Sequence, residues 1–519
     1  MAKKKPARKK KTRIEKTKQG ACRYVLLPPR GITSSATVAA ASVEPFLTSL
    51  HAAKTATVSS NVKMRVVDQI VQNGAKLVEM TEAAALELRA SQPGLRVVPE
   101  VFYERAVYRP EVATKPKPSA SGASTKIVIK VVAEATGKPV TGVHVVAFTD
   151  FSVGEGAEGN SNASGKVGLA LGAASRKLDR LFLFPGPNRW PMLKENVTIT
   201  TGTVFKVHEI DLGFTDCVRF FYGNAALDVG KGVTVGIVDA GVALDHPELK
   251  VSGGLNTVPG EKSTDFGDGG GEHHGSHVGG IVAARGTPPG GIRGLAPGVS
   301  LRSYRVFPAT PPGGEGAGAS NFSIAKAIHA AISDGCDLIN MSLGVKSGSP
   351  GQPDDDVLRS AIADARAAGV LVLIAAGNDG RKPVSFPGSD PRAVAVSALG
   401  RVGTFLADAD SVGDVMAPFG SDSKNFIAAF SNVGSEIDLT GPGVGVISTV
   451  PGGHAVMSGT SMACPAVTGA CARLLADDDT TRNLPRGQSR SDAIAKLAFK
   501  AAKSLGFDIT LEGHGLIKT

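Results

Sequence analysis

The sequence predicts an α/β fold, with a parallel sheet and helices on both of its faces, preceded by a small α+β unit and a small β-sandwich. The main observation is an alternation that begins after about residue 225. Largely apolar, strand-like segments at 233–238 and 370–376 alternate with helical segments at 323–333 and 355–368. Strands that alternate with helices of this length predict a parallel sheet covered on both faces. The length of 519 residues agrees with about three domains.

The α+β unit is predicted for residues 21–109. Residues 22–27 and 75–80 have the composition of strands, and a helical segment is expected near 43–53. Thr81 is a good N-cap for a further helix, which would end at a Pro-Gly pair. This mixture of strands and helices indicates a separate unit ahead of the α/β region.

A β-sandwich is predicted between the two. Residues 110–125 are rich in Pro and Ser, which is typical of a linker. Apolar and polar residues then alternate, as at 127–131 and 143–147, in short segments separated by turn residues. This pattern predicts a small sandwich over 126–205, and the α/β region then comprises 206–519.

The net charge of +10 is concentrated in an N-terminal tail. Between Lys3 and Lys18 there are ten basic residues and one acidic residue, so this segment alone carries +9. Residues 1–20 are expected to be disordered. The tail has two interpretations. It is an electrostatic anchor that binds nucleic acid or an anionic membrane surface, or it is a solubilising tail. Because aromatic residues make up only 5% of the chain, base-stacking platforms are scarce and no specific nucleic-acid partner is expected.

Cysteine usage and apolar runs bear on the compartment. The five cysteines are scattered, without the Cys/His spacing of a zinc site or a disulfide framework. The longest apolar run has the length of a buried strand, so no transmembrane segment is expected. The basic N-terminus has no apolar region behind it, which argues against a standard secretory signal. These features favour a cytoplasmic location, and secretion by another route stays open.

Three short motifs hold the residue types of a nucleophilic serine site. Asp239 ends the strand-like segment 233–238, His274 precedes an apolar helical stretch, and Ser461 stands at the start of another. The carboxyl ends of parallel strands line the crevice where open α/β sheets bind ligands. A serine at a helix start lies near N–H groups that favour developing negative charge. A serine hydroxyl is a weak nucleophile, and it needs a base that a third group orients.

Asp, His and Ser in this chain order form one of the known orders of a catalytic triad. On these motifs, the region from about 225 to 519 resembles the subtilisin-like serine proteases. The resemblance implies that Ser461 is the nucleophile and His274 the general base and then acid. It implies that Asp239 is the buried carboxylate that holds the imidazole tautomer.

Further segments carry the same resemblance. Asn340-Met341-Ser342-Leu343-Gly344 resembles the family's substrate-binding strand, and Ala375-Ala376-Gly377-Asn378 resembles the segment beside the S1 pocket. The resemblance implies that the Asn378 side-chain amide and the backbone N–H of Ser461 form the oxyanion hole. The residues implied in substrate binding are Ser342, Leu343, Gly344, Ala376, Gly377 and Ser385.

Two expectations concern specificity. Residues 316–320 should offer an edge strand that pairs with an extended peptide. Ser385 is expected near the base of the S1 pocket. Because no Asp or Glu is obvious there, we expect no strict preference for a basic residue before the scissile bond.

Two other histidines flank His274. The family motif places the catalytic histidine immediately before a glycine, and Gly275 follows His274. His277 is expected to pack into the first helical turn, and His273 is expected to lie in solvent.

The implied chemistry requires no cofactor, and no metal ligand is assigned. The family's common calcium site uses a loop after the histidine helix, here 285–293, which contains no side-chain carboxylate or amide. Calcium takes about six to eight oxygen ligands, so this loop is a poor candidate, although Glu248 stands where the family often has an Asp ligand. The Asp-rich stretch 408–422 has two interpretations, a calcium loop and a solvated surface insertion.

Two more resemblances concern the N-terminal half. Residues 75–100 resemble the end of an inhibitor-type protease propeptide, which has a ferredoxin-like α+β fold; the alternative is an unrelated α+β domain. The resemblance implies a self-inhibited precursor whose cleft is blocked by its own N-terminal unit, with cleavage expected within 108–124. Residues 126–205 resemble carboxypeptidase-regulatory or transthyretin-like modules.

The function that these features favour is hydrolysis of peptide bonds by a serine endopeptidase. Its partners would be a protein or peptide substrate and its own propeptide-like domain, which would act as an intramolecular inhibitor. The alternatives are a family-related transpeptidase or peptide cyclase, and a catalytically silent binding scaffold.

Overall fold

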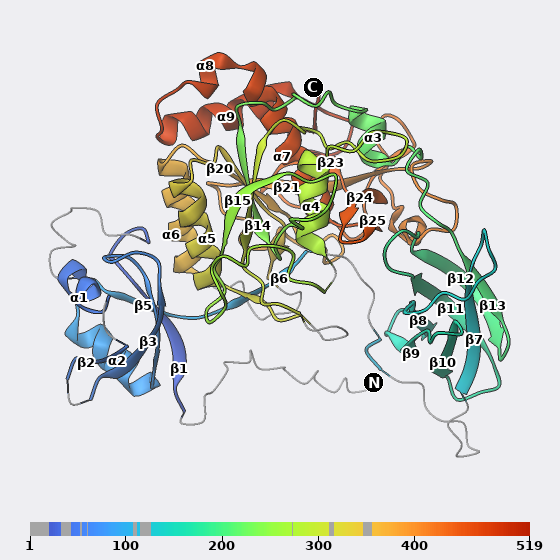
Figure 1. Ribbon diagram of the computed structural model, residues 1–519, viewed down its shortest axis with the longest axis horizontal. Helices are drawn as coiled ribbons and strands as arrows, with labels where there is room; N and C mark the ends of the chain where they lie inside the picture. The colour runs from blue at the N-terminus through green and yellow to red at the C-terminus, as the bar shows by residue number, and fades with distance from the viewer. Residues whose placement is uncertain are drawn as a thin grey trace, which may run out of the picture.

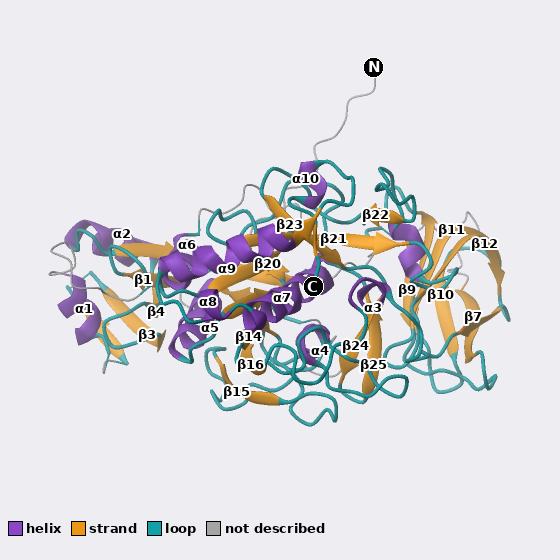
Figure 2. Ribbon diagram, turned by 90° about the horizontal axis from the view of Figure 1, so that it is seen from above, coloured by secondary structure: helices purple, strands orange, loops and turns teal. Residues whose placement is uncertain are grey.

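The computed structural model consists of three bodies in a row (Figure 1). It describes residues 20–32, 43–51, 54–59, 61–106, 112–114, 126–271, 273–310, 316–345 and 355–519. An N-terminal unit lies at one end, an α/β body in the middle and a β-sandwich at the other end, and the view from above shows the same order (Figure 2). The basic tail predicted for residues 1–20 lies, apart from Gly20, outside the described residues.

The N-terminal unit is a five-stranded antiparallel sheet, in the order β2-β3-β4-β1-β5, with two helices. Its elements are β1 (Cys22–Leu27), α1 (Val43–Ser49), β2 (Thr55–Thr57), β3 (Lys63–Gln69), β4 (Lys76–Met80), α2 (Glu82–Ser91) and β5 (Arg96–Pro99). Thr81 caps α2, since its side chain accepts a hydrogen bond from the backbone N–H of Ala84 at 3.2 Å.

The two faces of this sheet have different partners. Tyr24 and Leu26 of β1 pack with α1 and α2 in the unit's own core. Val25 and Leu27 point to the other face and pack into an apolar cluster of the α/β body. Because side chains alternate along a strand, one strand serves both the unit's own core and its contact with the body.

The sandwich is built from a sheet of order β10-β7-β13 and a sheet of order β12-β11-β8-β9. Its strands are β7 (Lys126–Ala133), β8 (His144–Asp150), β9 (Glu155–Asn160), β10 (Lys166–Ala170), β11 (Ser175–Phe184), β12 (Met192–Thr200) and β13 (Val204–Val207). Ile127, Ile129 and Val131 alternate inward from β7 into the core between the sheets. An aromatic cluster that includes Phe148, Phe182 and Phe184 covers the outer face of the second sheet.

The α/β body contains an eight-stranded sheet of order β15-β16-β14-β18-β20-β21-β22, in which β23 also pairs with β21. Its pairs are parallel except for β21 with β22. The strands are β14 (Thr234–Asp239), β15 (Val251–Asn256), β16 (Ser300–Arg305), β18 (Leu338–Met341), β20 (Leu371–Ala375), β21 (Val394–Arg401), β22 (Asn425–Ile427) and β23 (Ile437–Pro442).

Helices cover both faces of this sheet (Figure 2). The helices α4 (His274–Ala283), α7 (Thr460–Asp477) and α9 (Gln488–Ala501) share one apolar cluster with Leu371 and Leu373 of β20. The helices α5 (Asn321–Ser333) and α6 (Asp356–Ala367) share another with Val372 and Ile374. The alternation along β20 confirms the predicted α/β fold with helices on both faces of a largely parallel sheet.

A short three-stranded sheet positions the site. In it β6 (Phe102–Arg105) pairs antiparallel with β17 (Ala319–Ser320) on one side and with β19 (Leu343–Gly344) on the other. The last strand of the N-terminal unit therefore lies inside the α/β body. The remaining elements are α3 (Cys217–Tyr222), the 3₁₀ turn η2 (Asp410–Asp414), β24 (Val446–Val450), β25 (Gly453–Met457), α8 (Asp479–Arg482), β26 (Ala502–Lys503), α10 (Ile509–Glu512) and β27 (Leu516–Ile517).

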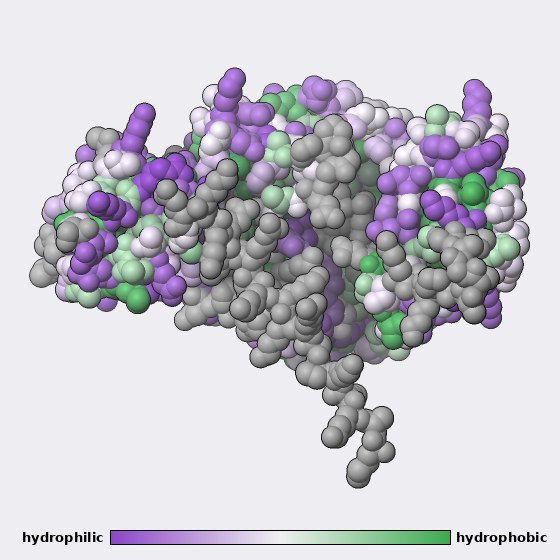
Figure 3. Space-filling view, turned by 90° about the horizontal axis from the view of Figure 1, so that it is seen from below, coloured by the Kyte–Doolittle hydropathy of each residue, from purple (hydrophilic) through white to green (hydrophobic). Residues whose placement is uncertain are grey.

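Within the described part of the chain, none of the helices combines the length and the apolar character needed to cross a bilayer. Seen from below, hydrophilic and hydrophobic side chains are interspersed over both end bodies (Figure 3).

Candidate active site

Each of the three predicted triad residues stands at the end of a secondary-structure element. Asp239 is the last residue of β14, His274 the first of α4 and Ser461 the second of α7. The apolar sequence of β14 buries the strand at the centre of the sheet, so its final carboxylate emerges at the carboxyl edge.

The Asp239–His274 pair is fully buried, with both side chains 0% exposed. Nδ1 of His274 lies 2.8 and 2.9 Å from the two carboxylate oxygens of Asp239. The carboxylate can only accept, so Nδ1 carries the proton and Nε2 is left as a base. Nε2 of His274 has no hydrogen-bond partner among the described residues, so its lone pair is not engaged.

Ser461 donates its hydroxyl to a peptide carbonyl of the chain itself. Its Oγ lies 2.6 Å from the carbonyl oxygen of Ala106, the residue that follows β6. The side-chain amide of Asn378 donates a short hydrogen bond to the same oxygen. The nucleophile candidate and the oxyanion-hole candidate therefore meet at one carbonyl group.

The orientation of the Asn378 amide is set by Thr460. Oδ1 of Asn378 accepts from the backbone N–H and from the hydroxyl of Thr460, both at 2.9 Å. With its oxygen held there, the amide nitrogen must face the cleft. Sequence reasoning missed this role of Thr460, and its position beside Ser461 was the available signal.

A glycine makes this approach sterically possible. A Cβ atom at Gly459 would lie 2.8 Å from the Ala106 oxygen and 3.3 Å from Nδ2 of Asn378. Any side chain here would push the peptide away from the two donors, so the glycine two residues before Ser461 is a requirement of the site.

The cleft holds β6 as an extended peptide. Arg105 and Glu104 face Leu343 and Gly344, and Tyr103 faces Ala319. The backbone N–H of Ala106 donates to the carbonyl of Ser342 at 3.2 Å. The residues expected to bind substrate at 342–344, and the expected edge strand within 316–320, thus pair with a strand of the same chain.

The other expected substrate-binding residues lie next to Asn378. The backbone N–H of Ser385 donates to the carbonyl of Ala376 at 2.9 Å, and a Cβ atom at Gly377 would lie 2.6 Å from the Ser385 hydroxyl. Sequence reasoning missed Asp379, whose carboxylate accepts from Ser385 Oγ at 3.1 Å and from Asn432 Nδ2 at 2.9 Å. An acidic group therefore lies within hydrogen-bond distance of Ser385, where none was obvious from the sequence.

The two neighbouring histidines differ in environment. His277 is buried, and its Nε2 lies 3.1 Å from the carbonyl oxygens of Val446 and Ala455. Burial, and then the nearby His274, lower the pKa of His277 to about 3. His273 does not lie free in solvent as expected, because its Nδ1 is 2.8 Å from Asp268, and this hydrogen bond raises the pKa of His273.

The loop suggested for calcium in the family is filled by protein groups here. The Glu248 carboxylate accepts from the backbone N–H of Ile292 at 3.1 Å and pairs with His454 at 3.1 Å. A neighbouring imidazole is an unsuitable member of a calcium shell of oxygen ligands, so the residues do not fit that ion. Across the described ranges, no cluster of three or more His, Cys, Asp or Glu side chains could hold a metal.

The Asp-rich stretch 408–422 is engaged in ion pairs with other side chains. Asp408 lies 2.5 Å from Nζ of Lys194, and Asp422 lies 2.7 Å from Arg401. The Lys194 pair joins this stretch to β12 of the sandwich.

Comparison with known proteins identifies the family. The family model described as the subtilase family matches residues 230–511. The chain belongs to the subtilase family. This confirms the resemblance noted from the sequence, and the match covers the parts of this subtilase that carry Asp239, His274, Asn378 and Ser461.

Individual relatives align with about half of the subtilase chain. Subtilisin NAT of Bacillus subtilis subsp. natto is 36% identical over 260 residues, which are 49% of this chain and 58% of that protein. Subtilisin DY of Bacillus licheniformis is 36% identical over 251 residues, 47% of this chain and 77% of that protein. Subtilisin BL of Lederbergia lenta is 37% identical over 244 residues, 47% and 76% of the two chains. The chain thus spans 58% of the length of subtilisin NAT.

Proposed function

We propose that this subtilase is a serine endopeptidase made as a self-inhibited precursor, and that it first cleaves its own chain after Ala106. The observation that carries the proposal is the Ala106 carbonyl oxygen, which accepts from Ser461 Oγ at 2.6 Å and from the Asn378 amide. A substrate carbonyl about to be attacked needs these two groups, a nucleophile and donors for its developing negative charge.

The proposed steps follow from the atoms present. Nε2 of His274 takes the hydroxyl proton as Ser461 Oγ bonds to the carbonyl carbon of Ala106. The negative oxygen that forms is stabilised by Nδ2 of Asn378, and the Asp239 carboxylate stabilises the imidazolium. His274 then gives its proton to the departing amine, the bond after Ala106 breaks, and water releases the acyl group by the same route.

The proposed cleavage point lies just before the stretch 108–124 expected from the sequence. Most of that stretch is outside the described residues, whereas the Ala106 carbonyl is described with both of its partners.

Self-inhibition is supported by how β6 is held in the cleft. It pairs with strands on both of its sides, and Tyr103 donates its hydroxyl to Asp355 at 2.6 Å in a buried position. These contacts do not depend on the bond after Ala106. The cleaved N-terminal unit would therefore keep occupying the cleft until it dissociates or is degraded.

The test compares the full-length wild type with Ser461→Ala, and uses Ser435→Ala, an exposed serine of the same body, as the matched control. Intact mass and N-terminal sequencing should show a product that begins at Val107 from wild type and from Ser435→Ala. Ser461→Ala should remain uncut, because loss of the nucleophile costs about 10⁶-fold in subtilisin.

The same proteins are then given casein and a peptide library. Hydrolysis by wild type and Ser435→Ala alone supports the endopeptidase. Ligated peptides would favour the transpeptidase alternative. Absence of both self-cleavage and turnover would favour the silent scaffold and overturn the proposal.

A further inference from the structure

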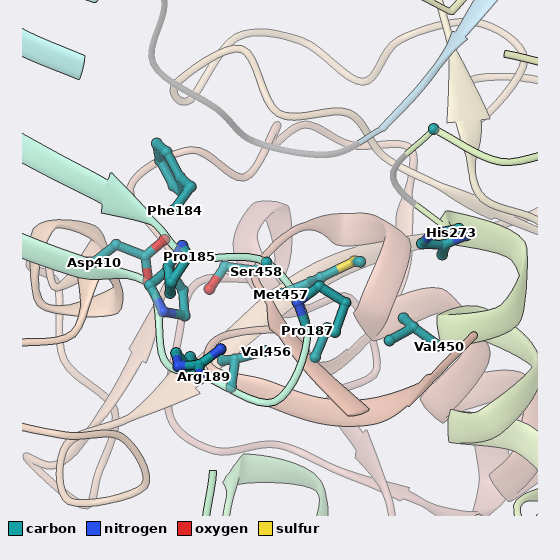
Figure 4. Close-up of a pocket in the computed structure, with 14 residues that line it drawn as sticks. Phe184, Pro185, Pro187, Arg189, His273, Asp410, Val450, Val456, Met457 and Ser458 are labelled. Atoms are coloured by element: carbon teal, nitrogen blue, oxygen red, sulfur yellow. The ribbon is translucent and has the colours of Figure 1, made fainter. Parts of the chain in front are cut away.

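A pocket lies where the sandwich meets the α/β body, beside the triad. The sandwich contributes Phe184, at the end of β11, and Pro185 and Pro187 of the following loop, and the α/β body contributes Val456 and Met457 of β25 (Figure 4). His273, next to the catalytic candidate His274, and Ser458, three residues before Ser461, also line it. The pocket lining thus includes near neighbours in sequence of two triad candidates.

The pocket has the size and lining for an amino-acid side chain. Its volume of about 220 Å³ is below the roughly 300–1,000 Å³ that is usual for small-molecule sites. Phe184, three prolines, two valines, Ala455 and Met457 make up just over half of the lining residues, and Arg189, His273, Asp410 and Ser458 supply charged and polar groups. The apolar part of the lining favours an apolar side chain.

The sandwich side of the pocket is firmly held. The backbone N–H of Asn188 donates to the carbonyl of His454 at 2.6 Å, and its side-chain oxygen accepts from the backbone N–H of His454 at 3.0 Å. Asn188 Nδ2 also donates to the carbonyl of Gly452 at 3.2 Å. Two residues further on, Trp190 is 1% exposed within the core of the α/β body. The loop is therefore fixed against the hairpin formed by β24 and β25.

The path of the chain shows which side of the scissile bond faces the pocket. Residues before Ala106 lie between β17 and β19, on the side of the N-terminal unit. Val112, six residues after Ala106, packs on the aromatic cluster of the sandwich that contains Phe184. The backbone N–H of Gly156 also donates to the carbonyl of Thr114 at 3.0 Å. The described residues thus lie on the side of the N-terminal unit before Ala106 and on the side of Phe184 from Val112 to Thr114.

We propose that the sandwich supplies part of the substrate-binding surface on the leaving-group side of the cleft. Its β11–β12 loop and Met457 bind an apolar side chain from the first or second residue after the scissile bond. This inference rests on the proposed endopeptidase function. In the chain's own sequence, the two residues after Ala106 are Val107 and Tyr108, which are apolar and aromatic.

The test uses the self-processed protein and two quenched fluorescent peptides. Both contain Phe-Tyr-Glu-Arg-Ala before the scissile bond, and they continue with either Leu-Leu or Asp-Asp. A third substrate carries p-nitroanilide directly after Ala and therefore has no residue on the leaving-group side. Wild type should prefer the Leu-Leu peptide in kcat/KM.

The test variants are Pro187→Asp, at an exposed position of the pocket, and Phe184→Ala. Each should reduce the Leu-Leu over Asp-Asp preference by about tenfold, the scale of one altered apolar contact. Hydrolysis of the anilide, whose leaving group carries no amino-acid side chain, should fall less than hydrolysis of the Leu-Leu peptide, and circular dichroism of each variant checks that it is folded. Val204→Asp, at an exposed position of β13 outside the pocket, is the matched control and should keep the wild-type preference.

The outcomes separate this inference from the function on which it rests. Normal anilide hydrolysis with an unchanged preference in both variants would overturn the inference and leave the endopeptidase in place. If wild type turned over neither the peptides nor the anilide, the proposed function would fail and the inference with it.

Discussion

The two end bodies are attached to the α/β body in different ways. The N-terminal unit lies with one sheet face on α5 and α6, through side chains such as Val25 and Leu27, and inserts one strand into the cleft. The sandwich instead places Trp190 inside the core of the α/β body, and the backbone and side chain of Asn188 form hydrogen bonds with the β24–β25 hairpin. The N-terminal unit is held in the cleft as a ligand would be. The sandwich shares its core with the α/β body and is an integral part of it.

The covalent connections show the same difference. The N-terminal unit is connected to the rest of the protein by the segment after Ala106. The carbonyl oxygen of Ala106 accepts a hydrogen bond from the Ser461 hydroxyl. The sandwich continues from β13 into α3 through described residues that pack on the core of the body, among them Ile210, Leu212 and Phe214. Cleavage after Ala106 would separate the first body and leave the second in place.

The largest effect that tests this comparison should come from Trp190→Ala. Truncation of a buried tryptophan should lower the free energy of unfolding of the processed protein by about 3–5 kcal/mol, measured by chemical denaturation. Leu27→Ala is the counterpart, since Leu27 is also buried. The processed protein would begin at Val107 and lack Leu27, so Leu27→Ala should act on the N-terminal fragment and raise its inhibition constant for the processed protein. An unchanged inhibition constant for the Leu27→Ala fragment, or a processed protein that is as stable with Trp190→Ala as without it, would contradict the comparison.

The second-largest effect should be a loss of stability of the α/β body in acid, because His277 is buried between α4 and β24. Its folded pKa is lowered to about 3 from 6.5, so below pH 6.5 the unfolded chain binds a proton that the folded chain does not. The free energy of unfolding therefore decreases as the pH is lowered, by about 1.5–2 kcal/mol between pH 6.5 and about pH 5.

Denaturation of the processed protein across this range measures the acid effect. His277→Gln keeps a donor for the carbonyls of Val446 and Ala455 and should flatten the slope. An equally steep slope in that variant would assign the acid sensitivity to other groups.

A smaller effect is expected for Tyr103→Phe, which removes the hydrogen bond between β6 and Asp355. Asp355 keeps Asn321 and the backbone N–H of Val357 as donors, so the loss should be about 1–1.5 kcal/mol. The inhibition constant of the N-terminal fragment for the processed protein should rise by about fivefold to tenfold. An unchanged constant would mean that the fragment does not inhibit through β6.

The smallest effect should come from Asp68→Asn, which breaks the ion pair with Lys326 of α5. Nζ of Lys326 lies 2.7 Å from the carboxylate, and both side chains are about one fifth exposed. Such a pair contributes up to about 1 kcal/mol and is screened by salt. Inhibition by the fragment should weaken slightly at low salt, and the difference between Asp68→Asn and wild type should disappear at high salt.

The sequence by itself determined the local features of this protein. The strand at 22–27 was readable from its composition, the cap at Thr81 from its residue type, and the α/β fold from apolar strands that alternate with helices. The triad candidates were readable because their chemistry needs particular residue types next to helix and strand ends. These properties depend on neighbours within a few positions along the chain.

Only the tertiary structure decided which distant segments meet. The segment 102–105 is short and of mixed polarity. It forms a strand only because β17 and β19 pair with it on its two sides. The contacts of Ala106 with Ser461 and Asn378, and of Asn188 with His454, join residues more than 200 positions apart. No local pattern records such pairs, because their energy comes from packing and hydrogen bonds that exist only once the three bodies are assembled.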